Sequence, residues 1–294
     1  MADAALSRTS FAPPRRREAW LSPRARRTLV SIVLAAICAV WVYPIVWMIS
    51  ASFKTNGEIF ADSGLIPDAP TFDNYTRAWR EANIGQYFFN TLFVTVGSVI
   101  ITTIAAALMG YVLGRRPIPG KTALMGLMVF TLFIPQGFTI IPVFELLTSV
   151  GLGQSLWGVM LATCGHSIVI FTFLFAGYFG QMPKELEEAS RMDGVGPLKT
   201  FWYVMLPLSK PIIVTVIVMQ TLQAWNDFLL PLVVTLANPD LRTLSVGVYS
   251  FRGEHFIDWG GMTAASAITI IPIILLFLFL QRYFIDGLAG AVKG

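Results

Sequence analysis

The sequence predicts an all-α integral membrane protein with six transmembrane helices. Of its 294 residues, 55% are apolar and only 13% are charged, whereas about 25% of the residues in a soluble domain are charged. The apolar residues also form blocks long enough to cross a bilayer, for which about 20 residues suffice. Six such blocks lie at 28–52, 87–113, 122–147, 155–179, 211–236 and 262–280.

An arginine-rich arm precedes the first block. Residues 1–27 contain seven arginines among prolines and serines, a composition that predicts a disordered arm held to anionic lipid by its charge. A nucleic-acid-binding arm is the alternative. The apolar run that follows is too long for the hydrophobic region of a signal peptide. We therefore interpret 28–86 as the first transmembrane helix and an external loop.

The distribution of basic residues predicts the orientation, because cytoplasmic flanks of transmembrane helices are enriched in Lys and Arg. With the amino terminus inside, only five of the 21 lysines and arginines fall in the outer segments, 53–86 and 237–261. Both termini and the polar segment 181–210 are then cytoplasmic. Basic residues that lie between spans, rather than on one face, do not indicate a nucleic-acid partner.

Reactive side chains are scarce inside the apolar blocks. Both cysteines, Cys38 and Cys164, lie there and are predicted to be small buried hydrophobes, with no disulfide or metal site. His166 and Ser167 are neighbours and cannot share one helix face. An intramembrane enzyme that uses His166 or Asp227 is therefore the weakest hypothesis.

The polar segment 181–210 predicts two short helices joined at a glycine. Pro183 suits a first helical turn, and the acids that follow it are favoured by the helix dipole. Gly194 can take the left-handed conformation that ends a helix. A second helix starts at Gly196-Pro197, and its apolar residues at helical spacing predict one face: Leu198, Phe201, Trp202 and Met205. An amphipathic connector at the membrane surface is the alternative.

This segment resembles the "EAA" coupling loop of ABC-importer membrane subunits. That loop reads Glu-Ala-Ala, three residues, Gly, nine residues and Ile-x-Leu-Pro. Glu188, Ala189 and Gly194 match it, and Pro207 ends the final motif at the same spacing. Ser190 replaces the second Ala and Val204 replaces the Ile; these are the two departures from the pattern.

Other stretches resemble the MalG-type maltose permease family of carbohydrate importers. They are SFKTNGEIF at 52–60, PTFDNYTRAW at 70–79, IPQGFTIIPVFELLTSVGL at 134–152, WNDFLLPLVV at 225–234, and the stretch 258–294. The resemblance implies a type I importer (MetI-like) transmembrane domain over 87–283, with the coupling loop at 181–210 and a cytoplasmic tail at 284–294.

The resemblance also implies a function. The chain would be a multi-pass permease subunit in a bacterial inner membrane, translocating a sugar or oligosaccharide and having no enzymatic activity. Another solute class, such as a polyol, glycerol phosphate or amino acid, is the alternative. Implied partners are a second, MalF-like permease chain, two copies of an ABC ATPase and an extracellular or periplasmic solute-binding protein. No GxxxxGK[ST] motif occurs, so ATP and Mg would be bound by the ATPase, with no cofactor in this chain.

Two groups of residues are candidates for ATPase contact. In the coupling loop they are the three matching residues, the closing proline and two polar residues flanking the corner: Glu188, Ala189, Asp193, Gly194, Lys199 and Pro207. The tail resembles a family segment that reaches the ATPase. The resemblance implies that Gly287, Gly290 and Lys293 are its candidates for ATPase contact. A frayed terminus is the alternative for the tail.

Polar residues inside the apolar blocks are candidates for the substrate pathway, because they are costly in lipid. Gln220, Gln223 and Asp227 follow one another at spacings of three and four and are predicted to share one helix face. Trp225 and Asn226 lie beside that face. Amides and an acid can form hydrogen bonds with sugar hydroxyls, and an aromatic ring can pack against the face of a sugar ring. Helix–helix adhesion or an outer gate is the alternative.

A break in the third block supplies one further candidate. Pro135-Gln136-Gly137 is predicted to interrupt this helix, and Gln136 then lines a cavity. A plain kink is the alternative.

Overall fold

The computed structural model describes residues 22–61, 64–80, 82–253 and 257–291. Within these residues the fold is helical, and the only extended pairing is an isolated bridge between Arg252 and Ile257. Four of the described helices are long and apolar enough to cross a membrane. They are α1 (Pro23–Ala51), α4 (Ile84–Arg115), α7 (Leu156–Gln181) and α14 (Trp259–Ala291).

Two further apolar segments are sharply bent pairs of helices. Helices α5 (Lys121–Leu132) and α6 (Gln136–Ser149) meet at 105°, and the segment Pro197–Leu208 meets α11 (Lys210–Asn226) at 80°. The described chain therefore has up to six spans, provided that each bent pair is one span. The predicted break at Pro135 is confirmed, and an angle of 105° is much more than a plain kink.

The remaining described helices are short. They are α2 (Asn56–Ala61), α3 (Asp73–Arg80), α8 (Glu185–Met192), α9 (Pro197–Thr200), the π-helix η1 (Phe201–Met205), α10 (Leu206–Leu208), α12 (Leu229–Val234), the 3₁₀ helix η2 (Pro239–Leu241) and α13 (Leu244–Tyr249). The chain divides into two compact units, 1–47 and 48–294, and the second contains every element from α2 onward. The predicted arm is helical from Pro23, at the start of α1, and its residues 1–21 lie outside the described part.

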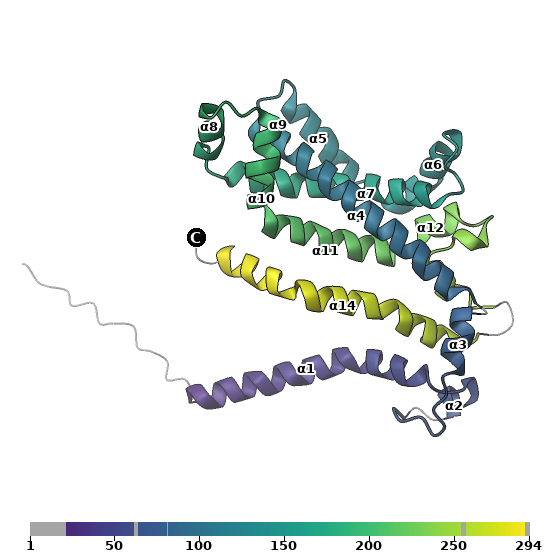
Figure 1. Cartoon of the computed structure of the whole chain (residues 1–294). Helices are drawn as coiled ribbons and strands as arrows, with labels where there is room; N and C mark the ends of the chain where they lie inside the picture. The colour runs from purple at the N-terminus through teal and green to yellow at the C-terminus, as the bar shows by residue number, and fades with distance from the viewer. Residues whose placement is uncertain (1–21, 62–63, 81, 254–256, 292–294) are drawn as a thin grey trace, which may run out of the picture. The chain divides into compact units, whose positions relative to one another are not determined.

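Within the second unit, α4, α7, α11 and α14 form a bundle of neighbouring helices (Figure 1). Helices α4 and α7 approach closely at Gly110 and Gly114. A Cβ atom built on Gly110 would lie 2.4 Å from Cβ of Phe175, and one on Gly114 would lie 2.6 Å from the carbonyl oxygen of Ala176. Only glycine fits at these two positions, so the two backbones pack almost directly against each other.

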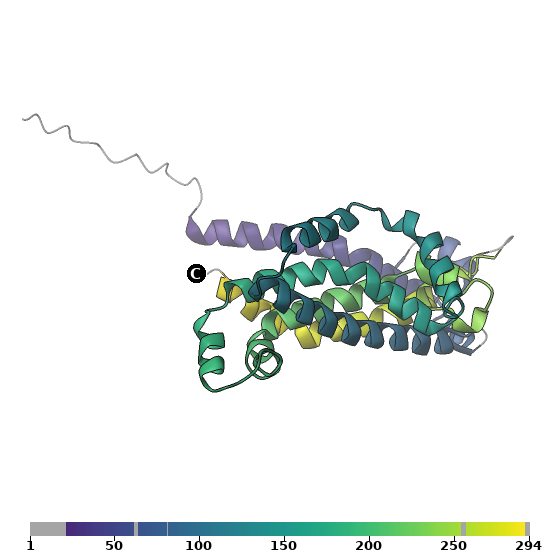
Figure 2. The ribbon, with the colours of Figure 1, turned by 90° about the horizontal axis from the view of Figure 1, so that it is seen from above.

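One end of the bundle carries α8 and α9, and the opposite end carries α3 and α12, as Figures 1 and 2 both show. At the second end, Asp258 ties together three segments that are far apart in sequence. Its carboxylate accepts from Asn56 Nδ2 (3.1 Å) and pairs with Arg77 (3.1 Å), while Arg77 also donates to Asn74 Oδ1 (2.9 Å). Three of the stretches that resemble carbohydrate permeases thus converge on one polar cluster.

The prediction of one continuous fifth span over 211–236 was wrong. Helix α11 ends at Asn226, Asp227 is extended (ψ 128°), and α12 starts at Leu229. Pro231 explains the break, because a proline ring in a helix clashes with the carbonyl of the residue four positions earlier, which here is Asp227.

Candidate functional site

The polar segment 181–210, hereafter the knob, folds as predicted at its corner. Gly194 has φ 73° and ends α8. The N–H of Gly194 donates to the carbonyl of Arg191 (3.0 Å), and the N–H of Val195 donates to that of Ser190 (2.9 Å). This pair of bonds is the Schellman arrangement, which needs a left-handed residue at the Gly194 position.

The second half of the knob differs from the prediction. Leu198, Phe201, Trp202 and Met205 were expected on one face. Phe201 (1% exposed) and Met205 (0%) are buried, whereas Leu198 (64%) and Trp202 (41%) are exposed. The cause is local, because residues 201–205 form a π-helix, which changes the direction in which successive side chains point. The apolar residues therefore divide between an anchoring side and an exposed side.

All six predicted coupling residues lie on the exposed surface of the knob: Glu188, Ala189, Asp193, Gly194, Lys199 and Pro207. Two large apolar side chains of the knob, Met192 and Tyr203, are also strongly exposed. An apolar surface with charged residues around it is typical of a protein-binding site.

The knob is anchored by a residue that sequence reasoning missed. Glu187 is buried and accepts hydrogen bonds from Tyr111 Oη (2.5 Å to Oε1) and Arg115 Nε (3.1 Å to Oε2). Arg116 Nη2 lies 3.4 Å from Oε1 and donates to Tyr111 Oη (2.7 Å). The available signal was the Arg115-Arg116 pair at the end of a predicted span, but nothing in the sequence connects it to Glu187 rather than to its neighbours.

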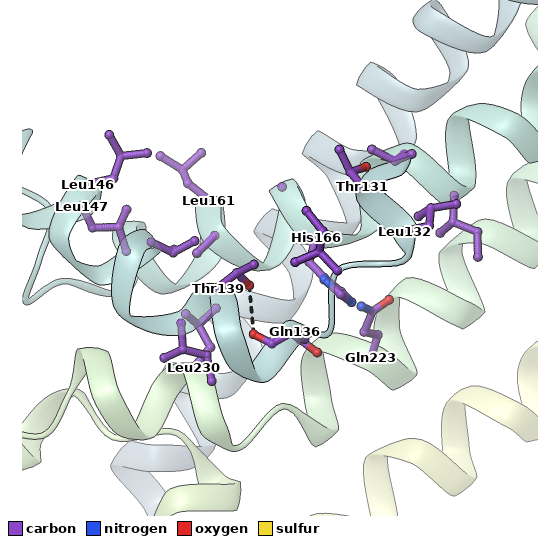
Figure 3. Close-up of a pocket in the computed structure, with 17 residues that line it drawn as sticks. Thr131, Leu132, Gln136, Thr139, Leu146, Leu147, Leu161, His166, Gln223 and Leu230 are labelled. Atoms are coloured by element: carbon purple, nitrogen blue, oxygen red, sulfur yellow. Dashed lines mark hydrogen bonds between the residues drawn. The ribbon is translucent and has the colours of Figure 1, made fainter. Parts of the chain in front are cut away.

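Four of the predicted pathway residues come together where α6 begins and α11 ends. Gln136, Gln223, Asn226 and Asp227 line a pocket of about 260 Å³. Gln136 and Gln223 also line an adjoining hollow of about 770 Å³ with largely apolar walls. Figure 3 shows the side chains of His166 and Gln223 pointing toward each other in this hollow, with Gln136 beside Thr139.

The structure places two other predicted pathway residues in the core. Trp225 packs among Ile84, Tyr87 and Leu244, and its indole N–H donates to the carbonyl of Thr269 (3.1 Å). Gln220 is fully buried, and neither amide atom has a hydrogen-bond partner. Because α11 ends at Asn226, the predicted helix face of Gln220, Gln223 and Asp227 does not extend to Asp227.

The tail candidates are only partly described. Gly287 and Gly290 continue helix α14, and Lys293 lies outside the described residues. Helix α14 ends at the same end of the bundle as the knob in both views (Figures 1 and 2). Among the described residues, no cluster of three or more His, Cys, Asp or Glu side chains could hold a metal ion.

Comparison with known proteins gives consistent matches. Residues 23–289 match the family described as "Binding-protein-dependent transport system inner membrane component". The diacetylchitobiose uptake system permease protein NgcG of Streptomyces coelicolor is 31% identical over 94% of this chain and 91% of its own. The melibiose/raffinose/stachyose import permease protein MelC of Bacillus subtilis is 30% identical over 92% of this chain and 100% of its own.

A solved structure has a similar fold. A chain of a bacterial ABC transporter involved in the import of the acidic polysaccharide alginate superposes with a TM-score of 0.78 at 23% identity. The match covers 90% of this chain and 99% of that one. At this identity the likeness shows that the two chains share a fold.

Proposed function

Because the chain belongs to the family of binding-protein-dependent transport system inner membrane components, we propose that it is a sugar or oligosaccharide permease subunit of an ABC importer. The family match over residues 23–289 carries this proposal. The substrate class follows from relatives named for the uptake of diacetylchitobiose and of melibiose, raffinose and stachyose, each aligned over more than nine-tenths of this chain.

The substrate path runs past the pocket of Gln136, Gln223, Asn226 and Asp227. Three amides and a carboxylate supply both donors and acceptors for sugar hydroxyls. The pocket lies where α11 breaks and where α6 begins. Interrupted helices of this kind surround the substrate in many transporters, because their free backbone groups line a cavity.

The knob is the docking surface for an ATPase subunit in the cytoplasm. With six spans, both chain termini and the knob would lie on the same side of the membrane, and the distribution of basic residues favours the inner side. The exposed coupling residues and the neighbouring apolar side chains of Met192, Leu198 and Trp202 provide a contact surface. A second permease chain, two ATPase copies and a solute-binding protein complete the proposed complex, with ATP and Mg bound by the ATPase. The carboxyl-terminal end of α14 lies at the same end of the bundle as the knob (Figures 1 and 2), and we assign it to the same partner.

Reconstitution of the complex in proteoliposomes tests this function. ATP-dependent accumulation of a labelled oligosaccharide that requires the loaded binding protein is expected. Gly194→Pro and Glu188→Lys should abolish uptake and weaken ATPase association while the chain still inserts. Glu185→Lys, on the exposed start of the same helix, is the matched control and should transport normally.

Two results would contradict the proposal. Accumulation of a polyol, glycerol phosphate or amino acid in place of sugar would refute the substrate class. For the orientation, Lys199→Cys should react with a membrane-impermeant maleimide in inside-out vesicles only. Reaction in right-side-out cells would put the knob outside and rule out ATPase docking.

A further inference from the structure

Glu187 connects the first helix of the knob to the end of α4. Its two carboxylate oxygens bind different groups: Oε1 accepts from Tyr111 Oη (2.5 Å), and Oε2 accepts from Arg115 Nε (3.1 Å). Arg116 adds a third contact, 3.4 Å from Oε1, and its guanidinium lies 5.4 Å from the centre of the Tyr111 ring. We call these four residues the latch: Tyr111, Arg115, Arg116 and Glu187.

Burial distinguishes the latch from an ordinary surface ion pair. The side chains of Arg115 and Glu187 are only 4% and 9% exposed. Exposed ion pairs contribute little because water screens them, whereas removal of one partner from a buried pair leaves the other charge uncompensated. The latch is therefore a strong connection whose loss has a large effect.

Arg115 also holds the backbone that leads into the knob. Its Nη1 donates to the carbonyl of Met182 (2.8 Å) and its Nη2 to that of Pro183 (3.1 Å). One guanidinium thus fixes both the carboxylate of α8 and the turn between α7 and α8. The planar arrangement of its donors allows several such bonds at once, which a lysine could not reproduce.

Tyr111 links the latch to the second half of the knob. Its ring lies 5.3 Å from that of Phe201 and 5.7 Å from that of Phe179, and all three side chains are buried in one cluster. On either side of Tyr111 along α4, Gly110 and Gly114 bring α4 against α7. The knob, α4 and α7 are therefore joined by polar contacts, ring contacts and close backbone packing.

We propose that Glu187 is a positioning residue for energy coupling: through the latch it makes the knob, α4 and α7 move as one body when the ATPase displaces the knob. This inference rests on the proposed function. It assigns Glu187 a role different from that of Glu188, which is exposed on the proposed docking surface. Without the latch, the knob would rotate on its short connections and the displacement would not reach the spans.

The test compares uptake per ATP hydrolysed in the reconstituted complex. Glu187→Gln replaces one of the two acceptor oxygens by an amide donor, which then faces either Tyr111 or Arg115, and removes the negative charge; we expect uptake per ATP to fall about tenfold with unchanged assembly. Tyr111→Phe keeps the ring contacts and the Arg115 pair and should lower the ratio about threefold. Glu185→Gln, an exposed carboxylate on the same helix, should leave it unchanged.

A second measurement follows the knob directly. Spin labels are placed at Glu185, exposed at the start of α8, and at Met109, exposed on α4, in a chain without Cys38 and Cys164. The distance distribution between the labels in the assembled complex should be narrow with native Glu187 and clearly broader with Glu187→Gln. An unchanged distribution would overturn the proposal.

Failure of the inference is distinguishable from failure of the proposed function. If the native complex shows no ATP-dependent uptake, the proposed function is wrong. If the native complex transports but Glu187→Gln and Tyr111→Phe keep the native uptake per ATP, the latch has no positioning role. The same holds if uptake and assembly fall in proportion in both variants, because the latch would then only support folding.

Discussion

Gly194 offers a direct measurement of how much the knob depends on one backbone angle. Its φ of 73° lies in the left-handed region, and no atom lies within 4 Å of a Cβ built on it. Gly194→Ala therefore introduces backbone strain and no steric clash. A non-glycine residue in this conformation costs about 1–2 kcal/mol, which corresponds to a factor of about 5–30 in a two-state population.

Gly196 is the matched control, because it also has open space around its Cβ position but an ordinary φ of −73°. In Gly194→Ala we expect the amide of Val195, which bonds the carbonyl of Ser190, to lose about 5–30-fold of its hydrogen-exchange protection. The ATPase concentration needed for half-maximal complex formation should rise by a similar factor. Gly196→Ala should change neither quantity. Equal effects of the two substitutions would refute the reasoning.

Three further predictions concern the bundle and the pocket. Gly114→Leu should lower the stability of the detergent-solubilised chain by about 1–3 kcal/mol through overpacking. Gly177→Leu is the control and should not lower it, because nothing lies within 4 Å of the Cβ position of Gly177. Thermal unfolding followed by tryptophan fluorescence compares the two variants. Gln220→Leu should raise the stability by about 1 kcal/mol, because its buried amide has no partner, and a lower unfolding temperature would contradict this. Asp227→Leu should reduce uptake at least about tenfold through loss of a charged hydrogen-bond acceptor, without reducing assembly. Asp240 is exposed, and Asp240→Leu is the control. Normal uptake by Asp227→Leu would show that Asp227 does not line the pathway.

Local sequence rules predicted the corner of the knob, but they could not predict its long-range contacts. A glycine after an acidic helix is a strong stop signal, and Gly194 has the backbone angle that this signal implies. The latch joins residues about 70 positions apart in sequence. No periodicity relates Arg115 to Glu187, so sequence reasoning chose Glu188 from the motif and overlooked the residue that anchors the helix.

Hydropathy located the apolar segments but not their directions. The block 122–147 reads as one apolar stretch, yet it contains two helices at 105°. The hydropathy averaged over a window is the same for one straight helix and for a bent pair of helices. Prolines were the available signal in both cases: Pro135 was used, whereas Pro231, which is incompatible with a helix through Asp227, was overlooked.

The bend between α5 and α6 has a consequence for biogenesis. At 1.5 Å per residue, these helices extend only about 18 Å and 21 Å, and a hydrocarbon core is about 30 Å thick. Neither helix can cross alone, so we expect the pair to reach its final depth only after α7 and α12, against which α6 packs, have been synthesised. Truncation of the nascent chain before Leu156 should therefore leave residues 121–149 at an intermediate depth that the finished chain corrects.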